Sequence, residues 1–295
     1  MKTTKPAIIL ATVTENSPNG STSKIQFAES KGRTLAYRSI GHGSPIILAN
    51  RFRGNLDVWD PLFLESLAKK HTVITFDYSG MGSSTGSAGR TILDFATDIK
   101  DIAEALNYKN AVAAGWSFGA FAAQVAATEF PELFTHTIVI GANPPGENEH
   151  QIEEKFFDVS RRLDYTVEDE TYLFFEPASE SSRKAAQYSH DRIALRTSDH
   201  DVKIPEELWE HFTYGAVDFA ADPTNSRQKM LDSNKPVLVL TGDHDVCFPA
   251  ENWYALTRKL PSTHLILFPQ TGHGPQHQFP KLTAKYIIDF IKHIK

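Results

Sequence analysis

Short apolar runs alternate with amphipathic segments along most of the chain. The apolar runs are residues 45–49, 72–76, 111–114, 137–140, 236–240 and 264–268. Most of them are continuously apolar, which is typical of strands buried on both faces of a parallel sheet. Two earlier segments, 24–28 and 33–38, predict an antiparallel pair that turns at Gly32.

Helical patterns fill the intervals between these runs. In residues 91–106, apolar side chains recur every three or four positions and form a single stripe. We expect helices at residues 56–69, 91–106, 118–128, 252–260 and 279–294. Strands that alternate with helices indicate an α/β fold built on a mostly parallel sheet.

Residues 144–235 interrupt this alternation. The stretch has no convincing buried strand and is far too long for a plain loop. Helical patterns occur at residues 153–163, 167–175, 181–195 and 206–219. We therefore predict a flexible lead-in at 1–23, a core at 24–143 and 236–295, and a helical cap insertion at 144–235 placed over one edge of the sheet.

Composition removes several classes of protein. The 295 residues include 30 Lys and Arg against 36 Asp and Glu, a net charge of −6, which disfavours nucleic-acid binding. A single cysteine, Cys247, excludes an internal disulfide framework and a Cys-rich zinc site. The apolar run at 7–13 is too short for a membrane helix and lacks a clear cleavage site. We expect a soluble, cytoplasmic protein that is a monomer or a homodimer. Its partner would be a small-molecule substrate, and we expect it to bind neither nucleic acid nor a membrane.

One motif carries chemistry. Gly115-Trp116-Ser117-Phe118-Gly119 matches G-x-S-x-G and lies between an apolar run and a helical pattern, the context that this motif requires. A serine on so sharp a turn projects its hydroxyl away from the sheet, and the glycines let strand and helix approach closely. The N–H groups of the following helix would face developing negative charge. Ser117 is therefore a candidate nucleophile.

A serine hydroxyl needs a base, which is usually a histidine oriented by a carboxylate. Among 12 histidines, His273 lies between two glycines just after the last predicted strand. That position is the carboxyl end of a strand, where α/β sheets place their sites. The run 236–240 leads into Asp243 and Asp245, and the residues alone do not choose between them.

With the chain order Ser117, Asp, His273, the sequence resembles the α/β-hydrolase superfamily, in particular its members with a helical cap, over about residues 24–295. The resemblance implies an eight-stranded, mostly parallel sheet with the cap inserted after strand 6. It also implies that the acid is Asp245, with Asp243 as the alternative. The segment 77–84 matches the family pattern D-x-x-G-x-G-x-S.

The oxyanion hole is where this sequence departs from the family. Relatives commonly have His-Gly after the strand equivalent to 45–49, and this chain has Asn50-Arg51. Carried over from the family, the donors are the backbone N–H groups of Phe52 and Phe118. Backbone donors survive a change of side chain, so the departure does not exclude catalysis.

For several side chains the sequence leaves two possible roles. Arg51 or Arg53 either leans into the site and favours a carboxylate-bearing substrate, or is solvated or paired in the scaffold. Trp116 either lines the pocket or packs under the cap. His273 and His277 have the spacing of a metal pair, but Gly and Pro intervene, so we expect no metal and no cofactor.

The resemblance implies a serine hydrolase of a small ester, thioester or lactone, working through an acyl-enzyme. Cofactor-free perhydrolysis, as in haloperoxidase-like relatives, and C–C bond hydrolysis use the same triad and remain alternatives. A non-catalytic ligand-binding member of the same fold is a second alternative. A dinucleotide-binding oxidoreductase is a third, based on the glycine-rich segment 80–86, whose spacing does not match G-x-G-x-x-G.

Overall fold

The computed structural model describes residues 19–294, and an eight-stranded sheet forms their core. The strands lie in the order β1-β2-β4-β3-β5-β6-β7-β8. They are β1 (Gln26–Ser30), β2 (Arg33–Ile40), β3 (Ser44–Ala49), β4 (His71–Phe76), β5 (Ala111–Trp116), β6 (Phe134–Ile140), β7 (Val237–Gly242) and β8 (Thr263–Phe268). β1 and β2 pair antiparallel, β2 also pairs antiparallel with β4, and the other pairs are parallel. The predicted mostly parallel sheet is confirmed.

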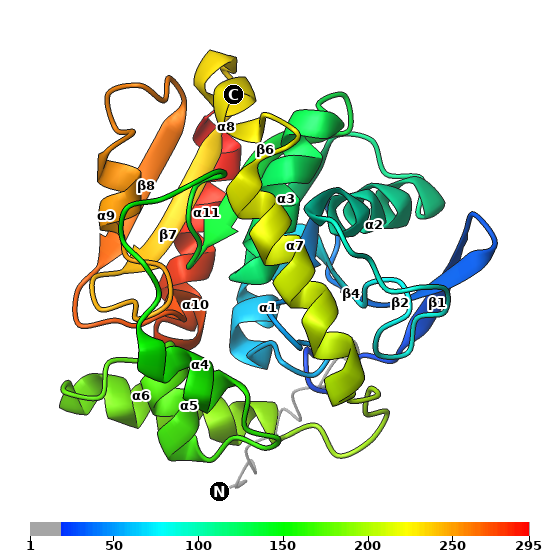
Figure 1. Ribbon diagram of the computed structural model, residues 1–295. Helices are drawn as coiled ribbons and strands as arrows, with labels where there is room; N and C mark the ends of the chain where they lie inside the picture. Colours follow the sequence, from blue (N-terminus) through cyan, green and yellow to red (C-terminus); the bar gives the residue numbers. More distant parts are fainter. Residues whose placement is uncertain (1–18, 295) are drawn as a thin grey trace, which may run out of the picture.

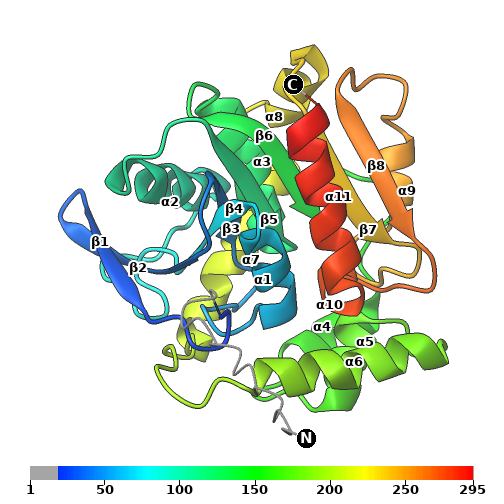
Figure 2. The same ribbon diagram turned by 180° about the vertical axis from the view of Figure 1, so that it is seen from behind.

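Helices cover both faces of this sheet. They are α1 (Pro61–Ala68), α2 (Ile92–Ala105), α3 (Phe118–Glu129), α4 (Glu154–Ser160), α5 (Val167–Phe174), α6 (Glu180–Ile193), η1 (Glu206–Leu208), α7 (Trp209–Ala221), α8 (Ser226–Asp232), α9 (Glu251–Tyr254), α10 (Pro275–Gln278) and α11 (Pro280–His293). α2 and α3 pack together on the face seen in Figure 1, and α1 and α11 on the opposite face seen in Figure 2.

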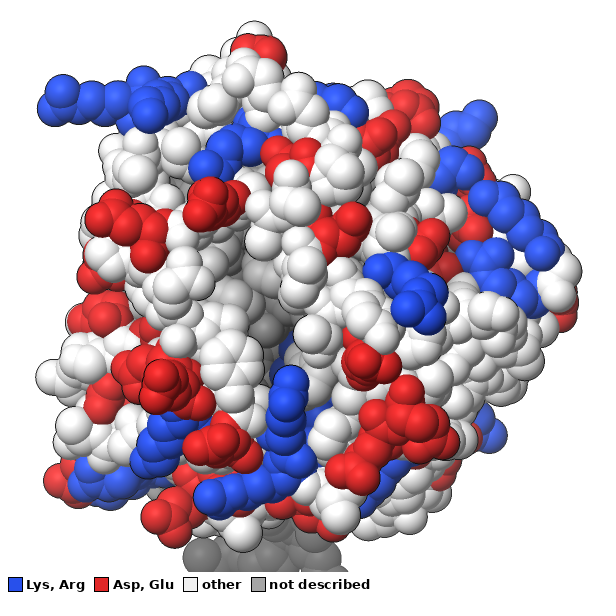
Figure 3. All heavy atoms as spheres, viewed as in Figure 1, with Lys and Arg blue, Asp and Glu red and all other residues white. Residues whose placement is uncertain are grey.

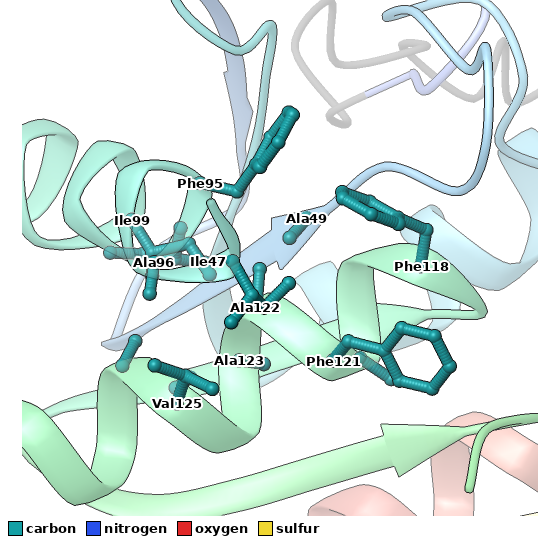
Figure 4. Packing of buried hydrophobic residues seen from close by; sticks show 14 of the residues in the cluster. Ile47, Ala49, Phe95, Ala96, Ile99, Phe118, Phe121, Ala122, Ala123 and Val125 are labelled. Carbon is teal, nitrogen blue, oxygen red and sulfur yellow. The ribbon is translucent and has the colours of Figure 1, made fainter. Parts of the chain in front are cut away.

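The core beneath α3 is unusually close-fitting because its contact residues are small. Alanines of α3 face the sheet, and Phe118 extends from the same helix toward Ala49 and Phe95, as Figure 4 shows, while Phe121 packs on Phe219 (4.0 Å between ring centroids). All of these side chains are buried. The close packing fixes the first turn of α3 against the end of β3, which brings two functional loops together.

Five helices, α4 to α8, lie between β6 and β7, so the predicted insertion after strand 6 is confirmed. They form two groups rather than one cover over an edge of the sheet. α4, α5 and α6 gather below the sheet in the view of Figure 1. α7 crosses in front of α3 and packs against both α2 and α3.

Some element boundaries differ from the prediction. α1 begins at Pro61 rather than at residue 56, because Asp60 caps its N-terminus by accepting a hydrogen bond from Leu62 N. The helix expected at 252–260 is only the short α9. α8 and α10 were not predicted, although Pro275 occupies the first position of α10, where a helix tolerates proline.

The predicted lead-in lies largely outside the described residues, as does the apolar run at 7–13. Within its described part, residues 20–22 form a turn. Gly20 N donates to Glu65 Oε1 (3.0 Å), and Arg196 Nη2 donates to the Gly20 carbonyl (2.7 Å). Within residues 19–294, no helix is long and apolar enough to cross a membrane.

Candidate active site

Ser117 occupies the sharp turn between β5 and α3. Its backbone has φ 57° and ψ −124°, a conformation that disfavours any residue with a Cβ atom. A Cβ on Gly115 would overlap the backbone of Gly119, and a Cβ on Gly119 would overlap the carbonyl of Ala49. The glycines of the motif are therefore required by the close approach of β5, α3 and β3.

The scaffold holds Ser117 through its backbone and not through its side chain. Ser117 N donates to the Ile140 carbonyl of β6 (2.9 Å), which fixes the turn against the neighbouring strand. The hydroxyl makes no capping hydrogen bond to α3, and the residue is 6 % exposed. The hydroxyl is thus free to react with a bound molecule.

His273 lies on the loop after β8 and is 1 % exposed. Its Nδ1 contacts Asp245 Oδ2 at 2.9 Å and Oδ1 at 3.1 Å. Two contacts fix the loop itself: Trp116 Nε1 donates to the His273 carbonyl (2.9 Å), and Gly274 N donates to the Phe174 carbonyl of the cap (2.8 Å). The imidazole and its loop are therefore held by Asp245, by Trp116 and by α5.

The structure distinguishes the two candidate acids. Asp245 Oδ1 accepts from the backbone N–H groups of Cys247 (2.8 Å) and Phe248 (2.9 Å), so this carboxylate is held in place against His273. Asp243 instead contacts His244 Nδ1 (2.6 Å) and accepts from Thr271 N (3.2 Å). Asp245 has the geometry that a triad acid needs, and Asp243 shapes the loop.

The other ring nitrogen of His273 carries no partner. Nε2 is buried, and none of the described residues, Ser117 included, lies within hydrogen-bonding distance. Such hydrogen bonds are often long in unliganded sites and shorten when substrate binds. With Nδ1 bound to Asp245, the unpartnered Nε2 is the atom available for proton transfer.

The candidate oxyanion donors stand on the loop after β3 and at the first residue of α3. In the hydrogen bonds found for residues 19–294, neither Phe52 N nor Phe118 N donates to a protein acceptor. Asn50, which stands where relatives have His, anchors the loop: its side chain donates to the Phe76 carbonyl (2.8 Å) and accepts from Trp59 Nε1 (2.7 Å). The substitution thus leaves a well-held loop with a free N–H group at Phe52.

The two arginines of this loop have different environments. Arg53 donates to the backbone carbonyls of Ser160, Arg162 and Leu163, so it ties the loop to the cap. Among residues 19–294, the one hydrogen bond found for Arg51 goes to the Phe52 carbonyl (2.8 Å), and its guanidinium lies over aromatic rings, including that of Phe174 at 4.9 Å. Burial lowers the pKa of the Arg51 guanidinium. Of the two interpretations considered from the sequence, the contacts of Arg53 agree with pairing in the scaffold.

Trp116 combines both roles considered from its sequence position. Its indole is 1 % exposed, binds the His273 carbonyl and packs against Phe174 of the cap (5.0 Å between ring centroids). It also lines a cavity of about 150 Å³ beneath the cap, together with Arg51 and His277. Trp116 thus contacts both this cavity and His273.

A chain of polar residues that no sequence pattern indicated supports this cavity. Ser189 of α6 bridges Asp60 Oδ2 (3.0 Å) and His277 Nδ1 (2.9 Å), and Arg192 pairs with Asp60. Burial lowers the pKa of His277 to about 4. Asp60, α6 and His277 lie far apart in the chain, and no local pattern reveals that they meet. Within the described chain, no cluster of three or more His, Cys, Asp or Glu residues could hold a metal ion.

Cys247, beside the acid, is a buried thiol. Burial, with a further contribution from the charge of Asp245, raises the pKa of Cys247 well above its ordinary value. A thiol in that environment is a poor nucleophile at neutral pH. It acts as a packed side chain and does not compete with Ser117.

Known proteins share this architecture. A family model described as the alpha/beta hydrolase fold matches residues 44–280. A solved structure of an alpha/beta hydrolase fold protein from Chitinophaga pinensis is 28% identical, covers 93% of this chain and 99% of that one, and superposes with a TM-score of 0.83.

Two curated relatives match over shorter stretches. The protein named "Putative carbamate hydrolase RutD" from Azorhizobium caulinodans is 26% identical over 152 residues, 51% of this chain and 56% of that protein. The one named "Putative non-heme chloroperoxidase" from Synechocystis sp. is 36% identical over 86 residues, 29% of this chain and 31% of that protein. The chain therefore spans about half or less of the length of these relatives.

Proposed function

The chain belongs to the alpha/beta hydrolase fold family, and from this premise we propose that it hydrolyses small esters, thioesters or lactones through a covalent acyl-enzyme. The observation that carries the proposal is the Asp245–His273 pair beside the strained turn of Ser117. Trp116, which directly precedes Ser117, donates to the His273 carbonyl, and the pair leaves a buried Nε2 without a partner among the described residues. In the proposal these residues would act as the nucleophile, the base and the orienting acid of acyl transfer.

In the proposed first half-reaction, Ser117 Oγ attacks the substrate carbonyl carbon and its proton passes to His273 Nε2. The negative charge on the carbonyl oxygen is stabilised by the N–H groups of Phe52 and Phe118, each worth about 3–4 kcal/mol in a site of this kind. His273 then gives the proton to the leaving oxygen or sulfur, the bond to the carbonyl carbon breaks, and the acyl-enzyme remains.

In the second half-reaction, water attacks the acyl-enzyme while His273 takes a proton from it. The carbon–oxygen bond to Ser117 breaks, the proton returns to Oγ, and a carboxylic acid leaves. Asp245 holds the imidazole tautomer throughout and stabilises its positive charge. Every proton that is taken is returned, so the sum of the two steps is hydrolysis alone.

A second activity uses the same acyl-enzyme. Hydrogen peroxide in place of water would release a peracid, and the relative named as a non-heme chloroperoxidase supports testing this reaction. The glycine-rich segment 80–86 supports the dinucleotide alternative less, because Gly80 N donates to the Thr85 carbonyl (3.0 Å) and closes this segment on itself.

The deciding experiment compares native protein with Ser117→Ala. We expect native protein to turn over p-nitrophenyl esters of short acids and Ser117→Ala to lose this activity while keeping its circular dichroism spectrum. Thioesters and lactones are screened in parallel to find the preferred leaving group. Adding hydrogen peroxide tests whether it replaces water as the acyl acceptor.

Two outcomes would contradict the proposal. Turnover by Ser117→Ala at the native rate would exclude Ser117 as the nucleophile. Native protein that neither hydrolyses any carbonyl substrate nor reacts with a fluorophosphonate probe would favour the non-catalytic, ligand-binding alternative.

A further inference from the structure

The cavity of about 150 Å³ beneath the cap is lined by three elements that are far apart in the chain. The loop after β3 contributes Arg51, the end of β5 contributes Trp116, and α10 contributes His277, while α5 and α6 close the cavity from the cap side. Resting on the proposed hydrolase function, we propose that this cavity binds a carboxylate carried by the acyl part of the substrate.

The unbalanced charge of Arg51 is the first reason. The neighbouring arginines have partners: Arg38 pairs with Asp57 (2.6 Å) and Arg192 with Asp60 (2.6 Å). Among residues 19–294, no ion pair within 4.0 Å is found for Arg51, and its Nε is buried without a hydrogen-bond acceptor. A desolvated guanidinium without a counter-charge is costly, and a carboxylate is its best geometric complement.

The acidic residues of the cavity do not contact Arg51 directly. Asp57 is paired with Arg38 and Arg196. Glu170 contacts His190 Nδ1 at 2.9 Å, and its negative charge acts on Arg51 without an ion pair within 4.0 Å among residues 19–294. A carboxylate that enters the cavity would therefore pair directly with the Arg51 guanidinium against the opposing field of Glu170.

The charge of the surrounding surface does not select anions in place of Arg51. Figure 3 shows that the face seen in Figure 1 is hollowed near its centre and that positive and negative side chains are interspersed over it. A mixed surface gives little electrostatic steering of anions. Selection for a carboxylate would therefore come from Arg51 inside the cavity rather than from the surface.

His277 shows that the cavity is built for a polar occupant. Ser189 Oγ must donate its single proton to the Asp60 carboxylate, so it accepts a hydrogen bond from His277 Nδ1–H. The neutral imidazole therefore has a bare Nε2, which is buried and without a partner among the described residues. A purely apolar group would leave both this atom and Arg51 Nε unsatisfied, whereas a carboxylate would accept from Arg51 Nε and a hydroxyl or water beside it would donate to His277 Nε2.

Size and position agree with a short acyl chain. At about 30 Å³ for each water-sized group, the cavity holds roughly five non-hydrogen atoms. Trp116, whose indole lines the cavity, directly precedes Ser117, and its ring centroid lies 6.0 Å from that of His273. In the proposed binding mode, a succinyl-sized group would extend past Trp116, with its carboxylate in this cavity and its ester carbonyl at Ser117.

The test compares kcat/KM for p-nitrophenyl hemisuccinate with kcat/KM for neutral p-nitrophenyl pentanoate. Native protein should prefer the anionic ester at least tenfold. Arg51→Met should lower this preference about 10- to 100-fold, the usual range for a charged hydrogen bond, and Arg51→Lys should restore part of it. The ratio cancels effects on the Phe52 loop that are common to both esters. Lys184→Met, which removes an exposed charge of α6, is the matched control and should keep the preference.

A binding measurement separates this inference from the proposed hydrolysis. By titration calorimetry, Ser117→Ala should bind propionate more tightly than propionamide, and adding Arg51→Met should remove the difference. Turnover of both esters without an anionic preference, or an equal loss for both in Arg51→Met, would overturn the carboxylate site alone. Arg51-dependent binding of propionate without any turnover would overturn the hydrolase proposal alone.

Discussion

The strained turn at Ser117 should lower the free energy of unfolding of the protein. A residue with a Cβ at φ 57° and ψ −124° costs about 1–3 kcal/mol relative to an allowed conformation. Ser117→Gly removes this cost, and Ser117→Ala keeps it. Glycine also makes the unfolded chain more flexible, which takes back about 0.4–1 kcal/mol. The difference leaves Ser117→Gly more stable than Ser117→Ala by about 1 kcal/mol.

The comparison isolates the backbone because both variants lose the same hydroxyl. Urea denaturation followed by circular dichroism measures the free energy of unfolding of each variant, and the expected gap corresponds to roughly 2 °C in Tm for a chain of this size. Ser66 in the middle of α1 provides the control. There the backbone is helical, so Gly should be less stable than Ala by about 1 kcal/mol.

The predicted result is therefore an inversion between the two sites. Ser117→Gly should be more stable than Ser117→Ala, whereas Ser66→Gly should be less stable than Ser66→Ala. If Ser117→Gly were as stable as Ser117→Ala or less stable, the turn would not store strain. The argument that the fold holds this serine in a reactive but unfavourable conformation would then fail.

Two further predictions concern ionisable groups. Asp245→Asn should lower kcat by about 10⁴-fold because His273 loses its orienting acceptor, whereas Asp243→Asn should change it less than tenfold; similar losses in ester assays would reject this assignment. The second concerns His277, with a pKa of about 4 when folded and about 6.5 when unfolded. Below pH 6.5 the unfolded chain binds the extra proton, so stability should fall by up to about 3 kcal/mol as pH drops toward 4. Denaturation of His277→Gln across this range should lack that component, and a native-like pH dependence would contradict it.

Much of the fold follows from local patterns. Continuous apolar runs predicted the six parallel strands, because a strand covered on both faces needs no polar side. The Gly32 turn predicted the antiparallel pair of β1 and β2. The errors lie where capping or packing decides, as at Asp60, which starts α1 five residues later than the apolar pattern indicates.

The chemistry of the site divides in the same way. The sequence by itself determined the Ser117 turn and the loop position of His273, since both depend on glycine spacing next to a strand. It left Asp243 and Asp245 equivalent by residue type, and it left Arg51 and Arg53 equivalent as well. Only the tertiary structure put Asp245 against His273 and tied Arg53 to the cap.

The isolation of Arg51 depends on tertiary structure for a physical reason. Whether a charge is compensated depends on every group that surrounds it, and these groups come from distant segments that no local pattern relates. Asp60, Ser189 and His277 meet only after the cap has packed on the core. The sequence determined where a nucleophile could stand, and the packing of the cap decided which charge would face its substrate.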